Sequence, residues 1–374
     1  MPSALTIRKI DGKPGSVYYP LEISNVALPS ASSSDVTVAM HAFSLDHRDL
    51  FIRQHLYPGT TFNVPLAANG VGVVVPSSSS SSSDAAQSLV GKRVILNPGH
   101  GWSSDPAGPE NPKGIAILGG TKTIPLGCAT TKLVVAADEV AEAPQHLSDI
   151  EAAALPLVGL TAWRATVVKA APAMEKGSNV LVTGIGGGVA IMALLFMVAK
   201  GVNVYVTSGD ESKIARAKEM GAKGGARYKD ADWEKQVLAM LPKERPLFDA
   251  IIDGSGGDIV DKAVKLLKHG GIISIYGMTI SPKMNWSMAA VLKNIEVRGS
   301  TMGSKKDFTD MLAYVNEKGI KPVVSKVAKG LKNLEAIDAL FEDMKAARQF
   351  GKLVVEITEE DRKQDEAGAG ASKL

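Results

Sequence analysis

Cysteine is nearly absent from this chain of 374 residues, since Cys128 is the only one. One thiol cannot form an internal disulfide or a zinc site built from several thiolates, and its isolation fits a reducing compartment. Concentrated charge is missing too: the formal net charge is +3, and no basic run with interleaved aromatic residues occurs. Nucleic acid is therefore not an expected partner.

Long hydrophobic runs are also rare. The exception is 180–199, twenty residues without a charge, which is long enough for a membrane helix. Three adjacent glycines would weaken such a helix and no second candidate segment exists, so we predict no membrane span. The N-terminus lacks the positively charged, apolar pattern of a secretory signal.

The segment 180–199 is instead typical of a strand, a glycine-rich turn and a helix. The apolar run 180–182 is followed by Gly184, Gly186, Gly187 and Gly188, and apolar residues then recur at helical spacing. This order points backbone N–H groups and a helix N-terminus at a phosphate. The alternative is an ordinary tight turn that binds nothing.

Three further short apolar strands are predicted at 202–206, 248–253 and 271–276, and a connecting helix is predicted at 214–220 after the first of them. Alternating strands and helices at this spacing predict an α/β fold with a doubly wound parallel sheet. Such sheets bind ligands at the carboxyl ends of their strands.

The first part of the chain reads as mostly β, with strand-like runs at 17–22, 36–41, 71–75, 90–96 and 128–135. Two amphipathic helices, 308–318 and 334–348, precede a last strand at 352–357 that we expect to return to the first domain. The serine run 77–83 is expected to be a solvated loop.

The length of the chain favours two domains over one. We expect the first to comprise 1–155 and 304–360, the second to comprise 156–303, and 361–374 to form a flexible tail.

Several stretches together resemble the medium-chain dehydrogenase/reductase superfamily, and more closely its zinc-independent quinone oxidoreductase and enoyl reductase branch. They are SLDHRDL (44–50), LPLVGLTAWRA (155–165), VTGIGGGVA (182–190), ARAKEMGA (215–222), DGSGG (253–257) and RQFGKLVV (348–355). The similarity runs from about residue 5 to 357. It implies a Rossmann dinucleotide-binding domain beside a mostly β, GroES-like catalytic domain.

The resemblance assigns the coenzyme turn. Gly184, Gly187, Gly188 and Val189 match the family's phosphate loop, and Ala190 replaces its final glycine with another small residue. The pyrophosphate is expected over Gly187, Gly188 and Val189.

Coenzyme choice depends on the end of the second strand. There Ser208 and Lys213 suit a 2′-phosphate, and Tyr228 lies where similar enzymes contact the adenosine end, so we expect NADPH. Two alternatives are an inward-facing Asp210, which would favour NAD, and a merely solvated Lys213.

Beyond the strand 271–276, Gly277 and Met278 are expected to face the nicotinamide.

Zinc is not expected. Ser44 stands where zinc-dependent relatives have their first thiolate, and Asn69, Gly70 and Val71 stand where they have glycine, histidine and glutamate. A structural zinc lobe of four cysteines is impossible with Cys128 alone.

Hydride transfer without a metal leaves three candidate catalytic residues. Asp46 replaces an asparagine that faces the nicotinamide in similar enzymes, and a carboxylate there must be protonated or paired, for example by Arg48. Tyr57 could donate a proton or serve only for packing. Thr161 resembles a nicotinamide contact, with a helix-start cap as the alternative.

The chain ends in Ser372-Lys373-Leu374, the tripeptide read by the peroxisomal import receptor. We therefore expect a peroxisomal protein, and otherwise a cytoplasmic one; a chance tripeptide on a flexible tail is the alternative. Relatives form dimers through an edge strand, for which 295–300 is the candidate here.

The expected function is transfer of a hydride from NADPH to an activated alkene or a quinone, which is a small-molecule substrate. One alternative is a zinc-independent alcohol or aldehyde dehydrogenase. The other is a non-catalytic protein that binds NADPH, a possibility that Asp46 strengthens.

Overall fold

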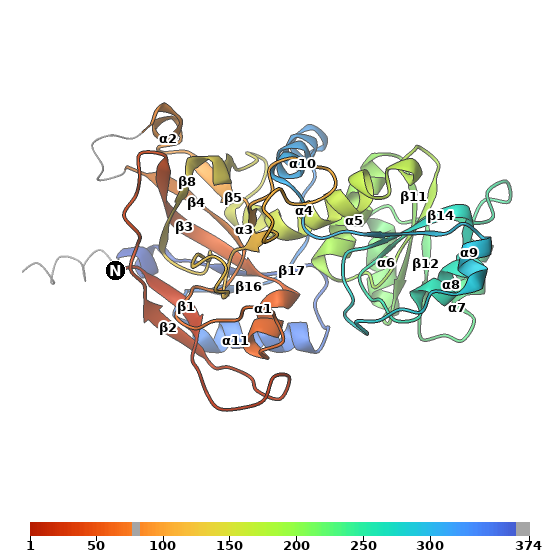
Figure 1. Cartoon of the computed structure of the whole chain (residues 1–374), viewed down its shortest axis with the longest axis horizontal. Helices are drawn as coiled ribbons and strands as arrows, with labels where there is room; N and C mark the ends of the chain where they lie inside the picture. Colours follow the sequence, from red (N-terminus) through yellow and green to blue (C-terminus); the bar gives the residue numbers. More distant parts are fainter. Residues whose placement is uncertain (77–82, 364–374) are drawn as a thin grey trace, which may run out of the picture. The chain divides into compact units, whose positions relative to one another are not determined.

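The computed structural model of the chain describes residues 1–76 and 83–363, which fall into two compact units. The central unit is Val158–Gly303, and the outer unit comprises residues 1–157 together with those from Ser304 onward. Each unit has a large sheet of its own (Figure 1). The sequence placed the two boundaries at 155/156 and 303/304.

The sheet of the central unit has six strands, all parallel, in the order β12-β11-β10-β13-β14-β15. Its middle strands are buried on both faces, as a parallel sheet between two helical layers requires. The predicted doubly wound α/β sheet is thereby confirmed. The strands are β10 (Asn179–Val182), β11 (Asn203–Ser208), β12 (Gly224–Arg227), β13 (Phe248–Asp253), β14 (Leu267–Ile275) and β15 (Glu296–Gly299).

Helices cover both faces of this sheet. Leu181 packs in one core cluster with Trp233 and Ile259, so α7 and α8 share that face, and Val180 and Val182 point to the opposite face. Right-handed crossovers place α5 and α6 on that opposite face. The helices are α5 (Gly188–Ala199), α6 (Glu211–Glu219), α7 (Trp233–Ala239), α8 (Ile259–Leu266) and α9 (Met288–Leu292).

The outer unit is built on a seven-stranded sheet in the order β16-β17-β3-β4-β5-β9, with β8 also paired to β3. Along β3 (Asp35–Leu45) buried and half-buried residues alternate up to Ala42, the pattern of a sheet with one covered face. The remaining strands are β4 (Asn69–Val75), β5 (Arg93–Leu96), β8 (Lys132–Ala136), β9 (Val140–Glu142), β16 (Val324–Lys329) and β17 (Lys352–Glu356).

Two small two-stranded sheets and six further helices lie outside the two large sheets, and residues 359–363 are also helical. The small sheets pair β1 (Ser3–Ile7) with β2 (Leu21–Asn25) and β6 (Gly99–His100) with β7 (Ala116–Ile117). The helices are α1 (His47–Arg53), α2 (Asp84–Ser88), α3 (Asp149–Ala153), α4 (Pro156–Trp163), α10 (Lys305–Lys318) and α11 (Leu334–Lys345). Short 3₁₀ turns at Ala137–Glu139 and Ala171–Ala173 and a π-helical turn at Arg164–Val168 join them.

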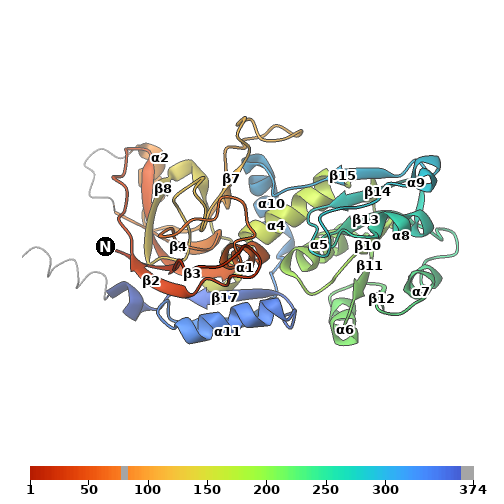
Figure 2. The same cartoon turned by 60° about the horizontal axis from the view of Figure 1, so that its bottom comes forward.

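The last strand returns to the first part of the chain, as predicted. β17 pairs antiparallel with β3, so the blue and red ends of the sequence lie side by side in Figure 1. α11 runs along the β16–β17 pair (Figure 2).

Three expected strands of the outer unit begin later in the structure than predicted. The run 90–96 becomes a strand only at Arg93, because the N–H groups of Val90 and Lys92 donate to Gln87 and Leu89 in a turn. The run 17–22 does not form a strand until Leu21, because Tyr19 bonds to Arg53 instead of to a neighbouring strand. The run 128–135 becomes a strand only at Lys132, because the Cys128 N–H donates to Ala67 and the Ala129 N–H to Leu66 in a loop.

The predicted serine loop and tail lie largely outside the described residues. Ser83, the last serine of the run, caps α2. Asp361, which the sequence assigned to the tail, is buried and accepts the Leu331 N–H at 3.0 Å, whereas Ser372, Lys373 and Leu374 are not among the described residues. In residues 1–76 and 83–363, no helix has the length and hydrophobicity that crossing a membrane requires.

Candidate coenzyme and active site

The glycine turn lies between β10 and α5. Gly184 (φ +63°) and Gly186 (φ +138°) have backbone conformations that residues with a side chain rarely adopt. Gly187 is the N-cap of α5, and a Cβ built on it would meet no atom within 4 Å. The first turn of α5, which begins with Gly188 and the half-buried Val189, therefore presents backbone N–H groups to open space, as anion binding requires.

Thr207 in β11 holds the turn in place. Its carbonyl accepts the Ile185 N–H at 2.7 Å, and its hydroxyl accepts the Gly184 N–H at 3.2 Å. The neighbouring strand thus orients the glycines through both backbone and side chain. No feature of the sequence singled out Thr207, because its role depends on strand pairing.

Asp210 caps α6. Its carboxylate accepts the Ser212 N–H at 2.9 Å and the Ser212 hydroxyl at 2.8 Å. Hydrogen bonds from Ser212, chiefly that of the hydroxyl, lower the pKa of this carboxyl. Ser208 is buried, and its hydroxyl oxygen accepts the Asp210 N–H at 3.2 Å. Both side chains are engaged in local hydrogen bonds. Asp210 is therefore less available to bind the ribose, and Ser208 is less available to bind the phosphate.

Tyr228 and Lys229 lie over Gly209. A Cβ built on Gly209 would fall 2.7 Å from the Tyr228 hydroxyl and 3.0 Å from Cε of Lys229. Tyr228 is 49% exposed and leaves its ring available to a ligand. Lys213 is half-buried on α6, and burial lowers the pKa of its ammonium while Asp210 opposes this effect. Sequence reasoning missed Lys229, although its place next to Tyr228 was a signal.

Gly277 and Met278 follow β14 at the same end of the sheet. A Cβ on Gly277 would lie 3.3 Å from the Gly254 carbonyl oxygen, and Met278 is partly exposed beside Gly256. Thr161 is buried inside α4, where its hydroxyl contacts Sδ of Met302 at 3.8 Å. It is the sixth residue of α4, so the alternative of a helix-start cap is wrong.

In the outer unit Asp46 is the centre of a buried polar cluster. Its carboxylate accepts hydrogen bonds from the ammonium of Lys352 on β17 and from the amide of Asn69 on β4. Lys352 also donates to the Leu45 carbonyl at 2.7 Å, and the Asn69 amide oxygen accepts the Leu157 N–H at 2.6 Å.

The prediction that Arg48 pairs with Asp46 is wrong. Arg48 donates instead to the carbonyls of Leu118 and Gly119 at 2.7 and 2.8 Å. Tyr57 lies in the turn after α1, half-buried, with the Arg48 guanidinium 4.7 Å from its ring centroid. The structure thus joins Arg48 to Tyr57 and Asp46 to Lys352.

The residues of this cluster do not form a zinc ligand set. An ammonium and an amide donate to the Asp46 carboxylate, and Ser44 donates its hydroxyl to the Ala153 carbonyl at 2.7 Å. Burial raises the pKa of the Cys128 thiol and so opposes the thiolate that a metal needs. Over the described part of the chain, no three His, Cys, Asp or Glu side chains gather in an arrangement that could hold a metal.

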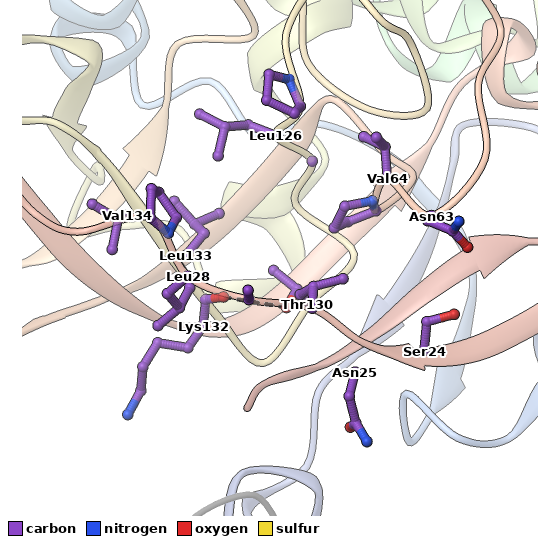
Figure 3. A pocket seen from close by; sticks show the side chains of 16 residues that line it. Ser24, Asn25, Leu28, Asn63, Val64, Leu126, Thr130, Lys132, Leu133 and Val134 are labelled. Carbon is purple, nitrogen blue, oxygen red and sulfur yellow. Dashed lines mark hydrogen bonds between the residues drawn. The ribbon is translucent and has the colours of Figure 1, made fainter.

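A separate cavity of about 320 Å³ opens in the outer unit (Figure 3). Apolar side chains such as Val64, Leu126 and Leu133 line it, together with Asn25 and Asn63. None of the residues predicted for the site lines this cavity.

Comparisons with known proteins agree with this architecture. The family model described as zinc-binding dehydrogenase matches residues 188–317, and the alcohol dehydrogenase GroES-like domain model matches residues 32–145. The zinc-type alcohol dehydrogenase-like protein YogA of Leptosphaeria maculans is 48% identical over 360 residues, which cover 96% of this chain and 100% of that protein.

Solved structures show the same fold. A structure of an NAD-dependent alcohol dehydrogenase superposes with a TM-score of 0.79 at 29% identity, over 96% of this chain and 100% of that chain. A variant of the crotonyl-CoA carboxylase/reductase AntE in complex with NADP gives 0.78 at 17% identity, over 95% of each chain. The two matching domain models and the close relative show that the chain belongs to the medium-chain dehydrogenase/reductase superfamily of oxidoreductases.

Proposed function

We propose that the chain is a zinc-independent reductase that uses NADPH on an activated alkene or a quinone. The observation that carries this proposal is the buried Lys352–Asp46–Asn69 cluster. Its Asn69 belongs to the segment 69–71, where zinc-dependent relatives have glycine, histidine and glutamate. The cluster consists of a protein ammonium, a carboxylate already paired to it and an amide. Without a metal to polarise an alcohol, the chemistry best suited to the site is reduction of an acceptor that is already electron-poor.

NADPH, when bound, supplies the hydride. The glycine turn and the first turn of α5 bind its pyrophosphate through backbone N–H groups. Lys213, with Lys229 beside Tyr228, supplies positive charge for the 2′-phosphate. The capped Asp210 carboxylate supports NADPH over NADH, because one of its oxygens accepts both hydrogen bonds from Ser212.

Acceptor reduction also needs a hydrogen-bond donor for the developing enolate oxygen. Tyr57 is our candidate, because its hydroxyl belongs to a half-buried ring that the Arg48 guanidinium holds from one side. We assign Asp46 a positioning role instead of direct contact with substrate, since both of its carboxylate oxygens have partners. Thr161 remains a proposed nicotinamide contact.

A second candidate is alcohol oxidation with NAD. It is favoured by the names of similar proteins, because the 48% identical relative is called zinc-type alcohol dehydrogenase-like and the 29% identical structure is an NAD-dependent alcohol dehydrogenase. A peroxisomal location through Ser372-Lys373-Leu374 and a homodimer are further parts of the proposal.

The test is a titration of the full chain with NADPH and with NADH, followed by fluorescence of the reduced nicotinamide. We expect a preference for NADPH, and we expect Lys213→Ala to raise the Kd for NADPH roughly tenfold, the loss of about one charge-assisted hydrogen bond. Lys218→Ala, an exposed lysine on the last turn of the same helix, is the matched control and should bind NADPH like the unaltered chain.

Equal or tighter binding of NADH would contradict the NADPH assignment. Turnover then separates the candidates: oxidation of NADPH by enones or quinones supports the reductase, and reduction of NAD by alcohols supports the alternative. Tight NADPH binding without any turnover would indicate the non-catalytic protein.

A further inference from the structure

One buried carboxylate joins two loops at the carboxyl end of the central sheet. Asp253, the last residue of β13, is 0% exposed. One of its oxygens accepts the Thr183 hydroxyl at 2.5 Å, and the other accepts the N–H groups of Ser255 and Gly256 at 3.1 and 2.7 Å. Thr183 directly precedes the glycine turn, whereas Ser255 and Gly256 belong to the loop after β13.

Asp253 is held by hydrogen-bond donors alone. Burial raises the pKa of its carboxyl, with bonds from Thr183, Gly256 and Ser255 opposing. Among the described residues no cationic side chain bonds to it, and a charged neighbour, Asp258, also raises the pKa. A buried carboxylate without a cation is costly, so its three donors must stay in place for it to remain stable.

The geometry links Asp253 to the segments that the dinucleotide would touch. Ser255 lies against the glycine turn, since its Oγ is 3.6 Å from a Cβ built on Gly184. The same loop supports the segment after β14, because the Thr279 hydroxyl donates to the Gly254 carbonyl at 3.2 Å and the Ile280 N–H donates to the Ser255 carbonyl at 3.0 Å. That segment begins with Gly277 and Met278.

We propose that Asp253 is a positioning residue for the central and nicotinamide parts of the bound coenzyme. Its carboxylate holds the glycine turn after β10 in register with the loop after β13, and through that loop with the segment after β14. The adenosine end depends on a different strand, since Tyr228 and Lys229 lie over Gly209 at the end of β11. This inference rests on the proposed coenzyme site.

The test compares NADPH with adenosine 2′,5′-bisphosphate, which contains only the adenosine end of the coenzyme. Binding of both to the full chain is measured by calorimetry for the unaltered protein, Asp253→Asn and Thr183→Val. An asparagine with its oxygen on Ser255 and Gly256 turns its N–H₂ group toward Thr183, so the charge-assisted bond from the Thr183 hydroxyl is replaced by a weaker neutral bond in which that hydroxyl accepts. Thr183→Val removes the hydroxyl donor and keeps the shape.

We expect Asp253→Asn to raise the Kd for NADPH at least tenfold and to leave the Kd for the bisphosphate within about twofold. Thr183→Val should raise the Kd for NADPH in the same selective way. Adding Thr183→Val to Asp253→Asn should produce little further loss, because the two residues act through one hydrogen bond. Asp258→Asn is the matched control, an exposed carboxylate five residues further on, and should bind both ligands normally.

An equal loss for both ligands, or no loss for either, would overturn the positioning role. Should Asp253→Asn fail to fold, Thr183→Val decides the matter: unchanged NADPH binding in that variant overturns the inference. Failure of the unaltered chain to bind NADPH is a different outcome, because it removes the proposed coenzyme site and this inference together.

Discussion

At the scale of single residues, the Asp46–Lys352 pair shows how strongly the outer unit depends on one buried charge. Both side chains are buried, and the ammonium and carboxylate also bond to Leu45 and Asn69. Lys352→Met should lower the free energy of unfolding by about 3–5 kcal/mol, because it leaves the carboxylate buried without a cation. Denaturant unfolding of the full chain measures this loss.

Asp46→Asn added to Lys352→Met should recover part of that stability, because it removes the unpaired charge and keeps a polar group for Asn69. If the double variant is no more stable than Lys352→Met, the carboxylate charge is not the cause of the loss. Lys326→Met is a useful control, because Lys326 pairs with Asp343 from an exposed position on neighbouring β16 and should cost little.

At the scale of elements, the loop between β6 and β7 is organised by one carboxylate. Glu110 accepts the N–H groups of Ser103, Ser104 and Asp105 at 2.6, 2.7 and 2.9 Å. These bonds, led by that from Ser104, lower the pKa of Glu110 to about 2. Trp102, buried in the same loop, donates its indole N–H to the Asp105 carbonyl at 2.8 Å.

The pKa of Glu110 determines how the stability of this loop depends on pH. Because the folded value of about 2 lies below the ordinary 4.5, the contribution of Glu110 is complete above pH 4.5 and is lost as the pH falls toward 2. Glu110→Gln should therefore loosen the loop already at neutral pH and abolish its acid transition. Tryptophan fluorescence and limited proteolysis between pH 7 and 2.5 report this, and identical acid profiles in the two proteins would count against it.

At the scale of the whole molecule, the free edge of β15 favours a homodimer. β15 pairs with β14 on one side, and in the described sheet no strand pairs with its other edge. Val297 on this strand is 39% exposed, with the exposed side chains of Met288 and Leu292 on the preceding α9. An unpaired strand edge with apolar neighbours is a template for pairing with a second copy.

Val297→Asp should convert such a dimer to a monomer, because a second copy would bury the new charge. Val327→Asp is the matched control: Val327 is 41% exposed on β16, one edge strand of the other large sheet, and its replacement should leave the dimer intact. Light scattering after size-exclusion chromatography measures the mass. A monomeric unaltered chain, or a dimer that survives Val297→Asp, would contradict the prediction.

Local patterns in the sequence were sufficient for the strand, turn and helix at 179–199, for the parallel sheet and for the family. The strand, turn and helix depend on hydrophobic spacing and glycine position within a few residues, where the covalent chain limits the possible geometry. The family followed from a resemblance carried by six stretches between residues 44 and 355. The strands predicted at 17–22 and 128–135 begin later in the structure, because contacts far along the chain decide where they start. Their apolar residues bond to loops that come close only in the folded chain.

The pairings within the site depend on distant parts of the chain. Lys352 reaches Asp46 across 306 positions, and Asp253 reaches Thr183 across 70. Sequence proximity suggested Arg48 as the partner of Asp46, but the β17–β3 pairing brings Lys352 to the carboxylate instead. Composition and spacing thus determine the local elements and the glycine turn. The strand order in the folded sheets determines which charges and hydrogen-bond donors meet, because a charged side chain gains a particular partner only when the two are buried next to each other.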